Sequence, residues 1–407
     1  PPRSTLFPYT TLFRSPEFQK TVETEFMSSP LREDEASNPW ARREFLKLMG
    51  ASMALSTASC IRRPVQKIVP YNKQPEEVTF GVPNFYTSTF FDGQEGLGVL
   101  IKTREGRPIK LESLETEPLT QGGTSIRAQA HVLSLYDLDR LTAPKKNLFN
   151  EKRTNKDTIS VSWENADTAI VEALKKGGVY ILTGNIVSPS TQAVVKDFSE
   201  GFKATHVAWE VLANEDVRKG QKASYGTDVL PFYRFDKSKM TVSIDADFLG
   251  TWIAPTVFTR QFSKTRKDFA NMSRMVAFDS NYSLTGANAD IRVRIKPSQQ
   301  LKVAVAIAQE LIVKQGKSSY AGNGEIKNWL NSFGNAAEGL HIEPALLKEI
   351  VKDLWAAQGE SLIVAGGLKT QTETSAALQA VVNLLNSALG NDGKTVQHRR
   401  SITSSGS

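Results

Sequence analysis

Short apolar runs alternate with amphipathic stretches along the second half of the chain. A short apolar run bounded by turn residues is typical of a buried strand, whereas apolar residues at every third or fourth position indicate a helix. The pattern therefore predicts strands at 179–183, 205–209, 240–244, 275–278, 291–295 and 361–365, and helices at 190–200, 301–312 and 373–389. This alternation favours an α/β fold with mostly parallel sheets flanked by helices.

The region before these elements, residues 61–150, has a different pattern. Its apolar positions form short runs separated by glycine turns, and residues 99–110 predict a hairpin that turns at Glu105 and Gly106. A polar stretch rich in Lys and Asn follows at 142–158. We therefore expect a smaller loop- and strand-rich N-terminal region over 61–150 and an α/β domain over 151–396.

The two ends of the chain do not fit these patterns. Residues 1–15 (PPRSTLFPYTTLFRS) resemble translated sequencing-adapter read-through, so we interpret them as a sequence artefact and exclude them from the fold. Residues 397–407 are polar and stop abruptly, as a truncated tail would. We expect the open reading frame to be cut at both ends.

Residues 16–60 have the character of an export signal. Their segment RREFLK fits the twin-arginine pattern R-R-x-F-L-K, with the key positions at Arg42, Arg43, Phe45 and Leu46. Such a signal is an address read by the Tat translocase, and the mildly apolar stretch 48–58 that follows is too short to span a bilayer. The pattern predicts export to the periplasmic side of a bacterial cytoplasmic membrane.

Cys60 closes this segment after a run of small residues. The run resembles a lipobox, and acylation of the cysteine would anchor the chain at the membrane surface. Thr57 departs from the aliphatic residue preferred three positions before the cysteine. Lipidation of Cys60 and a bystander cysteine in a removed or retained peptide are therefore both open.

Composition narrows the classes of chemistry. The chain has 407 residues, 40% of them hydrophobic, and a net charge of +7 without any run of five Lys or Arg, which argues against nucleic-acid binding. It has 1 Cys and 4 His, whereas an iron–sulfur cluster or a structural zinc needs about four such ligands. The chain therefore builds neither by itself, and it has no run of the roughly 20 apolar residues that span a bilayer.

Ligands of open parallel sheets bind outside the carboxyl ends of the strands. In this sequence those ends are Gly184-Asn185, Asp245–Asp247 and Gly366-Gly367, although each glycine could equally serve a tight turn. The aspartates near strand ends fit no two-carboxylate mechanism and are expected to cap helices or turns: Asp245, Asp247, Asp279 and Asp290. His206 lies inside a predicted strand, so we expect a satisfied core histidine.

Seven stretches in order carry a family resemblance. They are RREFLKLMGASMALSTASC, KIVPYNKQPEEVTFGVPNFYTSTF, KTREGRPIKLE, AHVLSLYDLDRL, DADFLGTWIAP, YSLTGANADIRVRIKPS and LNSALGNDGKTV. From about residue 16 to 396 the chain resembles the N-terminal part of the iron–sulfur, molybdopterin-oxidoreductase-like subunit of alternative complex III, a variant-Tat-translocated molybdopterin oxidoreductase. The resemblance implies a molybdopterin-oxidoreductase-like fold and a longer chain, whose missing C-terminal part holds several iron–sulfur clusters. It also implies partners in a membrane respiratory complex, namely haem c and integral membrane subunits.

The resemblance departs from true pterin enzymes at two places. There is no Cys between Ile61 and Ser160, where that superfamily carries a cluster motif. The superfamily segment I-R-P-G-T-D, whose Asp holds the guanine end of the cofactor, corresponds here to IKPSQQ, so that Ser298, Gln299 and Gln300 replace Gly, Thr and Asp. An amide cannot replace the charge-assisted hydrogen bonds of a carboxylate, and Ser298 adds a Cβ where the backbone should approach the ligand. Only weak cofactor-binding candidates remain, namely Gly184, Asn185, Ser298 and Gln300.

We therefore expect a fragment that is itself non-catalytic: a pterin-free scaffold of an iron–sulfur electron-transfer subunit in a membrane quinol-oxidising complex. The alternative is a genuine molybdopterin-dependent periplasmic oxidoreductase with a substrate funnel over the Gly184 and Gly366 loops. A third reading is an exported lipoprotein used only for binding.

Overall fold

The computed structural model describes residues 46–47, 49–50, 76–93, 95–149, 156–210, 214–367 and 373–401. Residues Glu76–Ser407 form one compact unit, and Pro1–Pro75 form another. In the unit Pro1–Pro75 the described residues, including Leu46, are helical and exposed. None of the described helices is long and apolar enough to cross a membrane.

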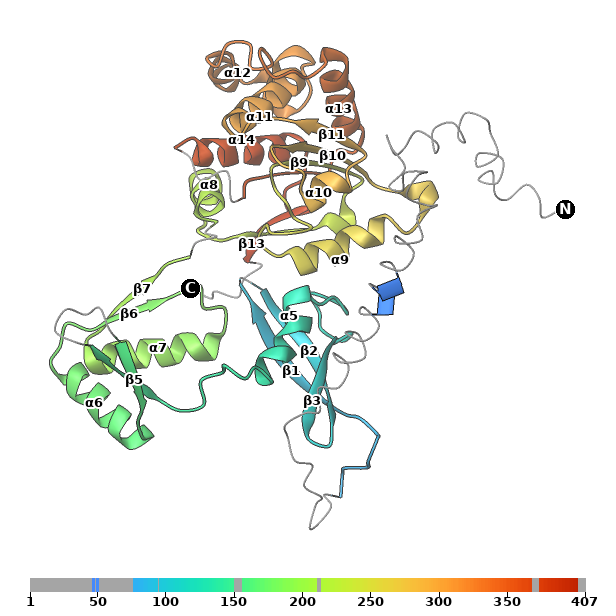
Figure 1. Ribbon diagram of the computed structural model, residues 1–407. Coiled ribbons are helices and arrows are strands. Elements are labelled where there is room, and N and C mark those ends of the chain that lie inside the picture. The colour runs from blue at the N-terminus through green and yellow to red at the C-terminus, as the bar shows by residue number, and fades with distance from the viewer. Residues whose placement is uncertain are drawn as a thin grey trace, which may run out of the picture. The chain divides into compact units, whose positions relative to one another are not determined.

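A parallel sheet of four strands lies among the helices of the C-terminal part of Glu76–Ser407 (Figure 1). Its strands are β9 (Met240–Ile244), β10 (Arg274–Asp279), β11 (Ile291–Arg294) and β12 (Ser361–Ala365), in the order β11-β10-β9-β12. All residues of β9 and β12 are buried, as expected for strands covered on both faces. The four predicted strands over 240–295 and 361–365 are thus confirmed to within a residue or two.

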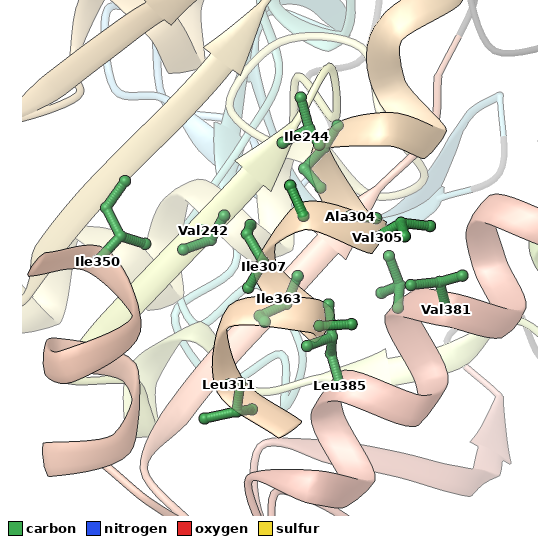
Figure 2. Close-up of a cluster of buried hydrophobic side chains, with 14 of the residues drawn as sticks. Val242, Ile244, Ala304, Val305, Ile307, Leu311, Ile350, Ile363, Val381 and Leu385 are labelled. Carbon is green, nitrogen blue, oxygen red and sulfur yellow. The ribbon is translucent and has the colours of Figure 1, made fainter. Parts of the chain in front are cut away.

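Helices cover one face of this sheet through an aliphatic core. Because side chains alternate along a strand, Val242, Ile244 and Ile363 point to the same side. They pack with residues of α11 (Gln300–Ala308), α13 (Pro344–Ala356) and α14 (Ser375–Ala388), as Figure 2 shows for Ile307, Ile350 and Val381. Helix α11 continues as a π-helical turn, Gln309–Lys314, so the predicted helix 301–312 is one continuous element with a change of pitch.

The opposite face carries an aromatic core. Leu362 and Val364 point there and pack with α9 (Pro255–Thr265) and with Trp252. A two-stranded antiparallel sheet of β8 (Pro231–Tyr233) and β13 (Val396–Ser401) joins this side. Residues 397–401 of the expected tail therefore belong to a strand. The remaining short elements of the domain are α8 (Glu215–Tyr225), α10 (Leu284–Ala287), α12 (Gly324–Asn331), η3 (Phe235–Lys237), η4 (Phe269–Asn271), η5 (Pro297–Gln299) and η7 (Ser319–Gly322).

The N-terminal region is an antiparallel meander of β1 (Asn84–Asp92), β2 (Glu95–Arg104) and β3 (Arg107–Ser113). The β2–β3 hairpin turns at Glu105 and Gly106, both with positive φ, which confirms the predicted hairpin. The short helices α5 (Ile126–His131) and η2 (Val132–Leu135) cover a small core on Leu97, Val99 and Leu111.

Residues 145–210 form a further set of elements. Strands β4 (Lys145–Phe149) and β5 (Lys156–Ser160) pair antiparallel across the predicted boundary at residue 150. Then follow α6 (Trp163–Lys175), β6 (Tyr180–Thr183), α7 (Pro189–Phe202) and β7 (Thr205–Ala208), with β6 and β7 parallel.

The expectation that His206 is a core residue is wrong. It lies in β7 as predicted, but it is exposed, and its Nε2 lies 2.8 Å from the hydroxyl of Thr183. The reason is that β7 pairs with β6 alone, and every residue of β7 is exposed.

Candidate functional site: the carboxyl edge of the parallel sheet

The carboxyl ends of β9, β10 and β12 lie at one edge, because the strands are parallel and in register. Polar residues or glycines follow each of these ends: Asp245–Asp247 after β9, Ser280 after β10 and Gly366-Gly367 after β12. In open α/β sheets this is where ligands bind.

Asp245 is the centre of this edge. Its residue is 9% exposed and its backbone has a positive φ of 54°. One carboxylate oxygen accepts hydrogen bonds from the backbone N and the hydroxyl of Ser280, at 2.7 and 2.8 Å. The other accepts from Nε2 of Gln300 at 2.5 Å. The carboxylate therefore joins β9, β10 and the first turn of α11, and both of its oxygens are used.

Two further carboxylates at the edge are also engaged with backbone and hydroxyl donors. Asp247 accepts from the backbone N and the hydroxyl of Thr285, each at 3.0 Å. Asp279 accepts from the backbone N and the hydroxyl of Ser283, at 3.2 and 2.7 Å. Asp247 and Asp279 thus bind donors at the start of α10, as expected for aspartates that cap turns and helices.

Gly366 and Gly367 are required at their positions. Their φ values are +117° and +127°, a region that residues with a side chain rarely adopt. A Cβ on Gly366 would lie 2.9 Å from Nε2 of Gln379 and 3.1 Å from a carboxylate oxygen of Asp216. A Cβ on Gly367 would lie 3.0 Å from the carbonyl oxygen of Asp245. Glycine is therefore needed at both positions, because neighbouring side-chain and backbone atoms lie too close for a Cβ.

Asp216, Gln379 and Trp252 form a buried polar group beside Gly366 that sequence reasoning missed. Burial raises the pKa of Asp216, although hydrogen bonds, including one of 3.3 Å from Gln379, partly offset it. Nε1 of Trp252 is buried without a hydrogen-bond partner in the described part of the chain. The acidic first turn of α8 is visible in the sequence, but nothing in it shows that Asp216 would be buried against α14.

The weak cofactor candidates lie beside two different sheets. Gln300 lies at the edge described above and is bound to Asp245, whereas Ser298 is exposed in η5. Gly184 and Asn185 follow β6 in the two-stranded sheet, where the backbone N of Asn185 donates to Glu210 at 3.3 Å. The four residues are therefore parts of separate local structures.

The export residues Arg42, Arg43 and Phe45 and the lipidation candidate Cys60 lie outside the described residues. Among the residues that the structure does describe, no group of three His, Cys, Asp or Glu side chains is placed to hold a metal ion.

Comparison with known proteins finds similarity both in sequence and in fold. No protein-family model matches the chain. It is 25% identical over 244 residues to the menaquinone reductase, molybdopterin-binding-like subunit, of Nitratidesulfovibrio vulgaris (strain Hildenborough). The match covers 56% of this chain but 32% of that protein, so the chain spans about a third of its relative's length.

Among solved structures, acetylene hydratase from Pelobacter acetylenicus has a similar fold, with a TM-score of 0.59 and 14% sequence identity. The similarity covers 74% of this chain and 43% of that enzyme. It confirms the expected molybdopterin-oxidoreductase-like α/β fold.

Proposed function

We propose that this chain is the pterin-free scaffold part of an iron–sulfur electron-transfer subunit in a membrane quinol-oxidising complex of the alternative complex III kind. In this proposal it is the N-terminal piece of a longer polypeptide, and the iron–sulfur clusters lie in the part that follows. Its partners are haem c and integral membrane subunits, on the periplasmic side of the cytoplasmic membrane.

Two kinds of similarity support a role in quinone-linked electron transfer. The sequence relative is named as a subunit of a menaquinone reductase and as molybdopterin-binding-like. The ordered motifs resemble the alternative complex III subunit over most of the chain. The match to only a third of the relative fits a chain that continues further.

The pairing of Gln300 with Asp245 is the observation that carries the pterin-free part. A pterin dinucleotide brings a pyrophosphate and a guanine to the carboxyl edge of such a sheet, and in the superfamily a carboxylate at the position of Gln300 holds the guanine. Here Gln300 offers no carboxylate, its Nε2 donates to Asp245, and the carboxylate of Asp247 lies at the same edge. These carboxylates would repel a pyrophosphate. The residues at this edge do not fit the cofactor.

The alternative is a genuine molybdopterin-dependent periplasmic oxidoreductase. The similar fold of acetylene hydratase supports this alternative, but a shared fold does not establish a shared function. The internal pairing of the edge residues counts against it.

Molybdenum and pterin content distinguish the two. We expect full-length protein purified from its native membrane to contain iron, but no stoichiometric molybdenum or tungsten by mass spectrometry of metals. Denaturation should release no pterin fluorescence. A molybdenum enzyme taken through the same purification is the control for cofactor loss. One equivalent of metal with released pterin would overturn the proposal.

A further inference from the structure

A cavity of about 510 Å³ lies between residues 122–127 and helix α9. Hydroxyl groups line it from both sides, with Thr124 and Ser125 on one side and Thr259 and Ser263 on the other. Two of its lining residues are charged, and both are arginines, Arg127 and Arg260. The cavity therefore offers hydrogen-bond donors and positive charge without a lining carboxylate.

Arg260 is the unusual member of this lining. Its Nε is buried and has no hydrogen-bond partner, and its guanidinium makes no ion pair with any residue that the structure describes. It also borders a second hollow with Glu115 and Glu117, but Glu117 binds the backbone N and hydroxyl of Thr120 instead. A buried donor left without a partner is costly, by about 1–3 kcal/mol, and more when it is charged.

The other carboxylates near the cavity are engaged elsewhere. Asp92 binds Arg127 and Ser125. Glu95 accepts from the backbone N atoms of Thr256 and Val257, at 3.3 and 3.1 Å. Neither of these two carboxylates therefore neutralises Arg260.

Thr124 gives a second, independent indication. Its hydroxyl is also buried without a hydrogen-bond partner in the described chain, and it lines the same cavity as Arg260. On the other wall, Ser263 follows Arg260 by three residues and Thr259 by four, so it lies beside both on one side of α9. Unpartnered donors therefore occur on both walls.

We propose that this cavity binds an anionic group of the phosphate or carboxylate kind, with the Arg260 guanidinium as its main partner and the hydroxyl of Thr124 as a second donor. A guanidinium matches both kinds of oxyanion through parallel N–H donors. The volume is within the roughly 300–1,000 Å³ of small-molecule sites, so the group can belong to a larger metabolite. Leu249, Gly250 and Leu284 complete the lining, so the cavity adjoins the segments that follow β9 and β10.

Calorimetric titration of the whole chain tests the proposal, with inorganic phosphate and acetate as probes at an ionic strength matched with potassium chloride. We expect saturable binding of at least one probe. Arg260→Gln should weaken it about tenfold or more, because it removes a charge-assisted hydrogen bond. The control Arg294→Gln removes an exposed arginine of β11 that does not line the cavity, and it should leave the affinity unchanged.

Absence of saturable binding, or equal weakening by both arginine variants, would overturn the proposal. Circular dichroism checks that each variant is folded. If Arg260→Gln does not fold, Thr124→Val replaces it in the comparison, since it keeps the side-chain shape and removes the unpartnered hydroxyl. It should weaken binding, and an unchanged affinity would contradict the proposed role of both walls.

Discussion

At the scale of single residues, buried carboxylates connect segments that are distant in the sequence. Asp245 joins two strands and a helix through Ser280 and Gln300. Glu95, at the start of β2, accepts from the first free backbone N atoms of α9 and so attaches the N-terminal meander to the α/β domain. A carboxylate at a helix N-terminus is favourable because it satisfies donors that the helix leaves unpaired.

Glu95 predicts a dependence of stability on pH. Burial raises its pKa from 4.5 to about 7, although hydrogen bonds from Val257 and Thr256 offset part of the increase. Between these values the folded chain holds a proton that the unfolded chain has released, so the free energy of unfolding falls as pH rises. This contribution is fully present below the unfolded pKa and lost as pH rises through about 7. It amounts to about 3 kcal/mol at most.

Urea unfolding at a series of pH values measures this effect. Glu95→Gln cannot titrate, so its free energy of unfolding should vary less over this range than that of the unchanged protein. Glu338→Gln, at an exposed position, is the matched control and should keep the original profile. Identical profiles for the Glu95 variant and the unchanged protein would show that Glu95 does not titrate in this range.

At the scale of elements, β13 is held in place by a histidine with two hydrogen bonds. Nδ1 of His398 lies 2.9 Å from Oε1 of Gln221, and its Nε2 lies 2.8 Å from Oδ1 of Asp392. The Gln221 amide is oriented by Asn383, whose own Nδ2 must donate to the carbonyl oxygen of Gly220. Oε1 of Gln221 is therefore an acceptor, and both nitrogens of His398 face acceptors.

His398 thus connects β13 to α8 through Gln221 and to the loop before β13 through Asp392. Burial raises the pKa of Asp392, but hydrogen bonds, led by that from His398, outweigh it and hold the pKa below its ordinary value. The ring of Tyr225 stacks on the imidazole with a centroid distance of 3.7 Å, so His398 is held on its face as well as at both nitrogens.

Replacing His398 should loosen β13. His398→Phe keeps a ring beside Tyr225 but leaves Asp392 and Gln221 without their donor, which should cost about 1–3 kcal/mol of unfolding free energy. His206→Gln, at an exposed strand position, should change it by less than about 0.5 kcal/mol. Urea unfolding measures both variants, and an unchanged free energy of unfolding for His398→Phe would contradict this interpretation.

At the scale of the whole molecule, the proposed export signal determines where the protein acts. Replacing Arg42 and Arg43 by lysine should keep the chain in the cytoplasm, because the Tat receptor reads the arginine pair. Replacing the second pair, Arg62 and Arg63, in the same way is the control and should not affect export. Immunoblots of periplasmic and cytoplasmic fractions measure the outcome, and equal export of both variants would refute the signal.

The sequence by itself determined the fold class and those elements that have a clear apolar pattern. The short, largely apolar runs at 240–244 and 361–365 form strands that are buried on both faces. The predicted helix 373–389 is α14 apart from its ends. Local patterns suffice for such features, since each one depends on residues next to each other in the chain. The departure at Ser298–Gln300 was also readable, because it replaces a carboxylate by an amide.

Only the tertiary structure decided how the side chains are used. That Gln300 binds Asp245, that Glu95 caps α9 and that Asp216 is buried beside Gly366 all depend on contacts between segments far apart in the sequence. His206 shows the same limit, since its strand has the predicted position but only one neighbouring strand. Burial and partners are properties of packing, and packing decides whether a polar residue holds the fold together or remains free for a ligand.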